Sequence, residues 1–509
     1  APISEQQSVE AQATLWGKEW LVGHEYPVLN WPSNMPPPSH KIRIHAFREA
    51  CRTFPTGTGL GWDAIHPRAL LRLSNSTIIR ILDLLDECEC RGEWPTEVWS
   101  VIIVLLPKPE GGFRPIGLLP FLPRVWMRAR RDIVVQWERD NHRSYLFAGE
   151  GKGADSAAWK QAARAELAAN KKNIYYAQLL LDLVKTFERV PQWALLREAV
   201  RLYYPLWLVR LSLNTYRLDR TLRVGQVYSC NIVAVRGITA GSGFATSEMR
   251  IMLIELMDAA VLIHRLVEPT VYVDDIALDA SGSFKAVSKA ISGFGKSICK
   301  AITDLKMTVS SSKSVCAAST PSLGHAICTS LSRYGIQLQT HVKSLGVGMT
   351  AGRRRTTKVT QARMRKFRSR PFHNLRNARV DPSIVLRTGG TAGMTYGNFC
   401  GTAPSVLLAQ RRSVAPAAAP ASGTVGQNLN MALILADGSP KGKVDPAFPA
   451  HSGPIVYMAK AVWHGWLADQ AMLSGTATAL LKQTKSSRPW LTVNGPFGGF
   501  VASATRLGW

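Results

Sequence analysis

The stretch TVYVDDIALDA at residues 270–280 is an apolar run interrupted in its middle by two neighbouring acids, Asp274 and Asp275. Strands seldom carry two adjacent carboxylates, because each costs free energy to desolvate and the two repel each other. Two interpretations account for the pair. The acids cap a turn at the end of a strand, or they hold a cation together with a further ligand.

A candidate for that further ligand lies upstream. The segment LLLDLVKTFERV places Asp182 at the end of another apolar strand, directly before a helix start. Two-metal phosphoryl transfer needs a third carboxylate brought close by a second strand, and the carbonyl of Leu183 could add an oxygen. Glycoside hydrolysis needs two acids facing each other across a sugar, which neighbours on one strand cannot provide because they point to opposite faces.

The segments LDLVKTFERV and YVDD, about ninety residues apart, resemble the palm of a reverse transcriptase, most closely that of a non-LTR retrotransposon. Asp182 and Phe187 match the first motif, an Asp followed by four residues and an aromatic, and Tyr272–Asp275 matches Tyr–x–Asp–Asp. The resemblance covers roughly residues 59–350. It implies an α+β fold of right-hand polymerase type, with fingers, a palm containing an antiparallel sheet, a helical thumb and a small C-terminal module.

The activity implied by the resemblance is RNA-directed DNA polymerisation, with an RNA template, a DNA primer and deoxynucleoside triphosphates as partners. Asp182, Asp274 and Asp275 would be catalytic and, with Leu183, would hold two Mg²⁺ ions, which Mn²⁺ can replace. The ring of Phe187 would clash with a 2′-hydroxyl, which argues against an RNA-dependent RNA polymerase. The plain alternative for Phe187 is a core residue.

Further segments match the family in chain order. LLPKPEGGFRPIGLLP resembles the fingers motif, in which Lys108 and Arg114 would hold the triphosphate; alone, it would read as a solvated basic hairpin. RGITAGSG resembles the loop that borders the nucleotide, and HVKSLGVGMT resembles the primer grip. The residues these matches assign are Gly241 and Tyr272 at the nucleotide and Leu345 and Gly346 at the primer.

A basic run at residues 353–379 holds eleven Arg and Lys and no acid. It follows the primer grip, where related polymerases have a thumb, and is expected to contact the phosphates of a template–primer duplex. A nuclear-localisation signal is the competing interpretation, and both could hold. The residues expected at the nucleic-acid backbone are Arg353, Arg354, Arg355, Arg363, Arg365, Lys366, Arg368 and Arg370.

The sequence departs from the family in the RGITAGSG loop. Ala240 stands where a Gln is usual before the second glycine, and Ala245 replaces a small polar residue. Glu188 stands where an Asp is common, which is a milder change. A catalytically decayed palm-fold protein that only binds nucleic acid is therefore the alternative function.

Composition points to a polyanionic partner, because 62 Lys and Arg against 35 acids give a net charge of +27. No apolar stretch is long enough to span a bilayer, so no membrane is expected. Eight cysteines without a regular framework suggest reduced thiols and an intracellular location, and a nucleus would suit a retroelement polymerase. The chain begins at Ala1 rather than Met and is expected to be a fragment of a polyprotein.

The motifs divide the chain as follows. We expect an irregular N-terminal extension at 1–58, fingers at 59–175, a palm with the catalytic site and primer grip at 176–350, a basic thumb-like region at 351–412, a linker at 413–430 and a connection-like module at 431–509. Within the palm, the apolar period from Phe284 to Leu305 predicts an amphipathic helix laid against a sheet.

Overall fold

The computed structural model describes residues 5–21, 28–38, 40–108, 111–352, 356–370, 372–418, 428–437 and 444–509. Helices and strands are intermixed along the chain, in agreement with the predicted α+β class. Two compact units are formed. The first comprises Ala1–Ser144, Leu183–Leu262 and Ser297–Val309, and the second comprises Tyr145–Asp182, Ile263–Lys296 and Ser310–Trp509.

The first unit contains a four-stranded sheet in the order β2-β1-β4-β5, in which β1 pairs antiparallel with β2 and parallel with β4. Its elements are α1 (Glu5–Trp20), α2 (Ile44–Arg52), η1 (Pro67–Arg72), α3 (Asn75–Arg91), β1 (Ser100–Pro107), β2 (Phe113–Leu118), α4 (Phe121–Ala129), α5 (Arg131–Asp140), α7 (Thr186–Arg189), α8 (Gln192–Arg201), α9 (Leu206–Tyr216), β4 (Asp219–Val224), β5 (Val227–Ile232) and nearly all of α10 (Ala245–Ile263).

The second unit contains a five-stranded sheet in the order β6-β7-β3-β8-β9 and a separate hairpin, β10-β11. Its strands are β3 (Tyr175–Leu181), β6 (Glu268–Tyr272), β7 (Asp275–Gly282), β8 (Val315–Ala318), β9 (Gln337–Leu338), β10 (Val342–Ser344) and β11 (Val347–Met349). Its helices are α6 (Ala154–Ala169), α12 (Pro321–Ser330), η2 (Ser332–Tyr334), α13 (Lys358–Arg368), α14 (Phe372–Asn377), α15 (Pro382–Val385), η3 (Leu386–Gly390), α16 (Thr391–Thr395), η4 (Asn398–Cys400), α17 (Pro404–Ala418), α18 (Leu429–Asp437), α19 (Ala447–Trp463), α20 (Asp469–Thr484), η5 (Pro489–Thr492) and α21 (Pro496–Arg506).

Helix α11 (Phe284–Asp304) begins in the second unit and ends in the first. Its apolar residues Val287, Ile291, Phe294, Ile298 and Ile302 are all fully buried, which confirms the predicted amphipathic helix. None of the helices in the described ranges is long and apolar enough to cross a bilayer.

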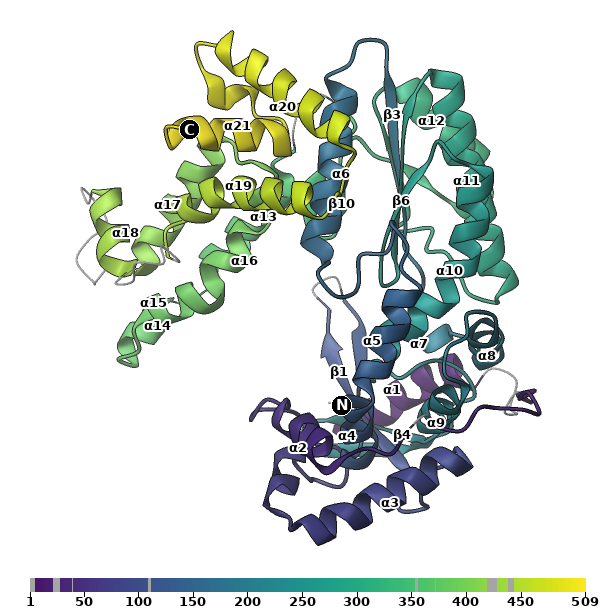
Figure 1. Ribbon diagram of the computed structural model, residues 1–509. Coiled ribbons are helices and arrows are strands. Elements are labelled where there is room, and N and C mark those ends of the chain that lie inside the picture. The colour runs from purple at the N-terminus through teal and green to yellow at the C-terminus, as the bar shows by residue number, and fades with distance from the viewer. Residues whose placement is uncertain are drawn as a thin grey trace. The chain divides into compact units, whose positions relative to one another are not determined.

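The sheet of the second unit lies between helices. In Figure 1, α6 lies on one side of β3 and β6, and α12 with the first part of α11 lies on the other. Successive side chains of β3 point to opposite faces of the sheet. Gln178 bonds to Gln161 of α6, whereas Leu179 lies where a Cβ on Gly295 of α11 would come within 2.9 Å of it. This glycine lets α11 approach the sheet closely.

The N-terminal segment differs from the prediction of an irregular extension, because residues 1–58 contain α1 and α2. Val9, Ala13, Trp16 and Trp20 recur at helical spacing and are buried. The guanidinium of Arg220 lies 4.5 Å from the centre of the Trp20 ring, a cation–π contact with β4. The helical pattern was overlooked beside the proline-rich residues that follow it.

The C-terminal region also differs from the prediction of a separate module behind a linker. Phe497 and Met458 share one buried core with Trp159 of α6 and Val347 of β11. The predicted linker begins inside α17, where Val414 is fully buried in a second core, and residues 419–427 of it lie outside the described residues. The alanine-rich sequence of this segment is typical of a linker. Small alanine side chains are also compatible with close helix packing, as in α17.

A buried acid in the first unit couples stability to pH. Glu248 of α10 is completely buried, and the Tyr216 hydroxyl donates to its Oε2 at 2.5 Å. Burial raises the pKa of Glu248 from 4.5 to about 7, although the hydrogen bond from Tyr216 acts in the opposite direction. The folded chain therefore holds a proton here that the unfolded chain has lost.

We expect the stability of the protein to fall as pH rises from about 4.5 to about 7, since the folded state binds the proton more tightly over that window. The change amounts to about 3 kcal/mol. Glu248→Gln should flatten this slope and melt higher than the wild type at pH 8 in thermal denaturation. Glu255→Gln, an exposed acid on the same helix, should keep the slope; an unchanged slope in Glu248→Gln would contradict the explanation.

Candidate active site

The two acids of the YVDD stretch lie at the tip of the β6–β7 hairpin. Tyr272 pairs with Asp275 across the hairpin, so Val273 and Asp274 form its two-residue turn. Val273 has φ +59°, a conformation that β-branched residues rarely adopt, whereas Asp274 keeps a negative φ. A positive φ at the first turn position alone is the pattern of a type II′ turn, which prefers glycine there. Val273 therefore holds backbone strain next to the acids.

Asp182 lies at the same end of the sheet. Strand β3 pairs antiparallel with β7 in a register that sets Leu181 opposite Ile276, so the next residue, Asp182, follows opposite Asp275. The backbone of Asp182 is fixed on its other side, because its N–H donates to Ser314 Oγ at 3.1 Å and its carbonyl accepts from Ser310 N at 2.8 Å. The structure thus brings together the three carboxylates predicted to be catalytic.

The electrostatics of this group are those of crowded like charges. Desolvation of its carboxyl group, followed by repulsion from Asp274 and Asp182, raises the pKa of Asp275 to about 6, although the residue is exposed at the tip of the hairpin. The ammonium of Lys313 acts in the opposite direction. Lys313 Nζ lies 3.8 Å from Asp182 Oδ2, and both side chains are partly exposed. A cation is therefore favoured at this edge.

Within the part of the chain that the structure describes, no group of three or more His, Cys, Asp or Glu side chains has the arrangement of a metal centre. Leu183, predicted to add a carbonyl ligand, belongs to the first unit. Its carbonyl accepts a hydrogen bond from Thr186 Oγ1 at 3.3 Å.

Asp279, a further acid in the same stretch, has a structural role that the sequence pattern did not indicate. It is 2% exposed on β7 and accepts hydrogen bonds from Tyr176 Oη at 2.8 Å and Gln178 Nε2 at 2.9 Å. Arg164 of α6 donates to it at 3.2 Å and also pairs with the exposed Glu268 at 2.7 Å. Burial raises the pKa of Asp279, and Arg164 opposes the shift. This network fastens α6 to the three strands behind the acids.

The residues predicted to hold the triphosphate lie in the first unit. Lys108 follows β1, and Arg114 is exposed on β2 of the same hairpin, in which Lys108 N donates to Gly112 O at 2.9 Å. Glu188 of α7 is buried, which raises the pKa of its carboxyl, while Arg220, Lys185 and Lys108 lower it. Lys108 therefore lies near the helix that carries Phe187.

The RGITAGSG loop joins these two parts of the first unit. Ile238 N donates to the carbonyl of the half-buried Phe187 at 2.7 Å, and Gly117 N of β2 donates to Ala240 O at 2.6 Å. Gly241 has φ +121°, and a Cβ there would lie 2.4 Å from the Gly117 carbonyl oxygen, so only glycine fits. The loop is attached through its main chain, which the replacement of Gln by Ala240 leaves in place.

The predicted primer grip is the tip of the β10–β11 hairpin. Leu345 has φ +46° and Gly346 φ +81°, as in a type I′ turn. Arg363 of α13 donates to the carbonyl of Gly346 and, at 2.5 Å, to that of Tyr396, and its guanidinium covers the Tyr396 ring. Burial lowers the pKa of Arg363. Arg363 thus holds the hairpin and is not free for the phosphate contact expected of it.

The other basic residues differ in their surroundings. Arg365, Lys366, Arg368 and Arg370 are all exposed. Arg368 in addition donates a hydrogen bond to Ser413 Oγ at 2.8 Å. Met364 and Phe367 anchor the opposite face of α13 in the core. Arg353, Arg354 and Arg355 lie outside the described residues.

No known protein-family model matches this chain, and no curated protein is significantly similar to it in sequence.

The strain at Val273 leads to a stability prediction. Val273→Gly removes backbone strain of about 1 kcal/mol but adds unfolded-state entropy of similar size. We expect its free energy of unfolding to stay near that of the wild type. Val271→Gly, which empties a buried position two residues earlier on β6, should lose about 3 kcal/mol. Equal losses in chemical denaturation would show that Val273 is not strained.

Proposed function

We propose that this chain is an RNA-directed DNA polymerase of retroelement type with a right-hand polymerase architecture. The observation that carries the proposal is the convergence of Asp182, Asp274 and Asp275 at one end of adjacent strands, with like-charge repulsion that raises the pKa of Asp275. The ordered motifs of the sequence, from the fingers segment to the primer grip, supply the reaction class.

The residue types at this edge suit a divalent cation, although the side chains of the described residues do not stand in the arrangement of a formed metal centre. Carboxylate oxygens are the protein ligands that Mg²⁺ prefers, and positive charge would relieve the repulsion that raises the pKa of Asp275. In the proposal, Asp182 and Asp274 hold two Mg²⁺ ions and Asp275 supports them. When bound, these ions would lower the pKa of a primer 3′-hydroxyl and neutralise charge on the transferred phosphate and the pyrophosphate.

The chain's own residues would do the positioning. Lys313 places a positive charge 3.8 Å from Asp182 Oδ2. Lys108 and Arg114 would bind the triphosphate, and Gly241 and Tyr272 would border the nucleotide. Phe187 would close the space beneath the sugar, and its backbone is fixed by Ile238. Leu345 and Gly346 would support the primer, with Arg363 holding their turn.

The partner in this proposal is a template–primer duplex of RNA and DNA. The net charge of +27 and the exposed Arg365, Lys366, Arg368 and Arg370 on or just after α13 support contact with sugar–phosphate backbones. The alternative is a palm-fold protein that binds such a duplex without copying it, and the departure at Ala240 favours that alternative. Only the polymerase needs the three carboxylates.

Primer extension tests the proposal. With an RNA template, an annealed DNA primer, Mg²⁺ and deoxynucleotides, we expect extension by the wild type. Asp274→Asn should lower the rate at least roughly a hundredfold, because a metal ion contributes several kcal/mol to transition-state stabilisation. Asp304→Asn, an exposed acid at the end of α11, should extend normally. Salt-sensitive binding by all three proteins without extension would favour the non-catalytic alternative.

The role of Phe187 is tested by sugar selection. Because removal of the ring opens space for a 2′-hydroxyl, Phe187→Ala should lower the preference for deoxynucleotides over ribonucleotides about tenfold or more in kcat/KM. Phe187→Tyr keeps the ring and should keep the preference. A preference that survives Phe187→Ala in a folded, active variant would remove this residue from the nucleotide site.

A further inference from the structure

A cavity of about 320 Å³ in the second unit lies away from the three carboxylates in sequence and is not used by the proposed chemistry. Its lining comes from three places: the start of α13 with Thr356, Thr357 and Thr360, the segment from Gly397 to the start of α17, and the chain between Leu491 and Asn494. Thr356 also lies against β11, since a Cβ on Gly348 would come within 2.8 Å of its methyl group. The cavity therefore adjoins the hairpin that carries Leu345 and Gly346.

Two helices begin at this cavity. Thr357 is the N-cap of α13 and Thr360 lies in its first turn, whereas Ala403 directly precedes α17 and Val406 lies in the first turn of that helix. The first N–H groups of a helix have no intrahelical acceptors and carry partial positive charge. The side chain of the N-cap residue, Thr357, makes no capping hydrogen bond, whereas Thr356 Oγ1 accepts from Lys358 N at 3.4 Å. Both helix ends thus favour an anionic group in the cavity.

A second and independent feature is the hydroxyl of Thr402. This residue is 6% exposed, and its Oγ1 has no hydrogen-bond partner among the described residues. A buried hydroxyl without a partner costs free energy, and most such groups in folded proteins are satisfied by protein, water or ligand. Because Thr402 lines the cavity, a polar ligand there would complete it.

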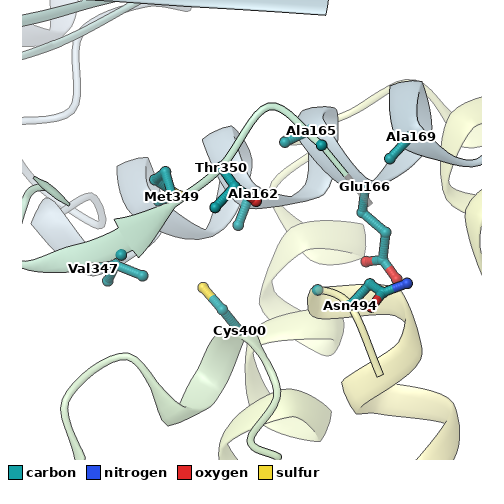
Figure 2. A pocket seen from close by; sticks show the side chains of 12 residues that line it. Ala162, Ala165, Glu166, Ala169, Val347, Met349, Thr350, Cys400 and Asn494 are labelled. Carbon is teal, nitrogen blue, oxygen red and sulfur yellow. The ribbon is translucent and has the colours of Figure 1, made fainter. Parts of the chain in front are cut away.

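None of the twelve residues that line the cavity is charged, so no carboxylate of the lining opposes an anion there. Asn494 borders it and a small neighbouring cavity, which contains the one nearby carboxylate among their lining residues, that of Glu166 (Figure 2). Glu166 accepts hydrogen bonds from Phe497 N at 2.8 Å and Gly498 N at 3.0 Å, the first turn of α21. Both oxygens of Glu166 thus already accept hydrogen bonds from the start of a helix.

Apolar side chains also line the cavity, beside the amides of Asn398 and Asn494. Leu491 is 66% exposed at the rim, while Val493 and Val406 are buried. The volume corresponds to about ten water molecules at roughly 30 Å³ each, more than a phosphate alone would fill. A nucleotide combines a negatively charged phosphate with a sugar and a flat base. It therefore matches a cavity that has two helix starts on one side and apolar side chains on another.

We infer that this cavity binds one nucleotide of a single-stranded nucleic-acid segment. Its phosphate lies at the starts of α13 and α17 within reach of the Thr402 hydroxyl, and its base packs against Leu491 and Val493. A base can enter such a cavity only after leaving its stack, so a duplex is excluded. The inference rests on the proposed function in naming a nucleic acid, and adds a second contact beside the primer hairpin.

The test combines changes in the protein with changes in the nucleic acid and measures the binding affinity of each pair. Nucleoside triphosphates are left out. An RNA template with a single-stranded overhang, annealed to a DNA primer, carries one uncharged methylphosphonate linkage at successive overhang positions, and binding is followed by fluorescence anisotropy. For the wild type we expect one position at which affinity falls about tenfold, the loss of one hydrogen bond to a charged group. Thr402→Val should bind the unmodified strand about tenfold more weakly and show a smaller loss at that position, because the two helix starts still favour the charged phosphate.

Thr476→Val is the matched control, a hydroxyl removed from α20, and should behave as the wild type. Thr402→Val is expected to fold, because the hydroxyl that it removes has no partner. Thr360→Val, at a half-buried position of the same cavity, repeats the test independently. Sensitivity profiles that are identical in the wild type and both cavity variants would overturn the inference.

A thermal-shift measurement with inorganic phosphate, against chloride at equal ionic strength, separates two sources of the anion. A stabilisation by phosphate that Thr402→Val abolishes, without any effect in the binding experiment, would assign the cavity to free phosphate and overturn the nucleic-acid site. If primer extension fails but the binding experiment shows the expected effect of Thr402→Val, only the proposed polymerase activity is rejected. If extension is normal but the binding experiment shows no effect of the cavity variants, only the nucleotide site in this cavity is rejected.

Discussion

The antiparallel pairing of β3 with β7 is the constraint on which the site depends. Its register sets Leu181 opposite Ile276, and Asp182 and Asp275 therefore leave the two strands at the same edge. A shift by one residue would turn every side chain of β3 to the other face. The buried contact between Arg164 and Asp279 opposes such a shift, because breaking it would leave a charge unpaired in the core.

The same pairing explains why like charges are tolerated. Apolar packing against α11 on one face and the buried hydrogen-bond network to α6 on the other stabilise the strands, and this free energy holds the carboxylates together against their repulsion. The cost appears locally, as the raised pKa of Asp275 and the positive φ of Val273. Strain and crowded charge at one edge of an otherwise well-packed sheet are common at functional sites, where a ligand relieves them.

The sequence predicted those features that depend on local pattern. The helical period of α11 and the acids at the ends of apolar strands both appear in the structure. Features that depend on tertiary contacts could not be predicted. Nothing in a basic run shows that Arg363 turns inward to the Gly346 carbonyl, or that Phe497 donates to Glu166 from 331 residues away. The helix α1 was a missed local signal, since its buried residues follow a regular spacing.

The central claim is that Asp182, Asp274 and Asp275 hold divalent cations as one site. Electron paramagnetic resonance of Mn²⁺ bound to the protein with template–primer measures this most directly, because it reports binding whether or not catalysis follows. We expect saturable binding by the wild type and by Asp304→Asn, and affinity at least roughly tenfold weaker for Asp274→Asn, which loses one charged ligand. Equal Mn²⁺ affinity in all three proteins would contradict the claim.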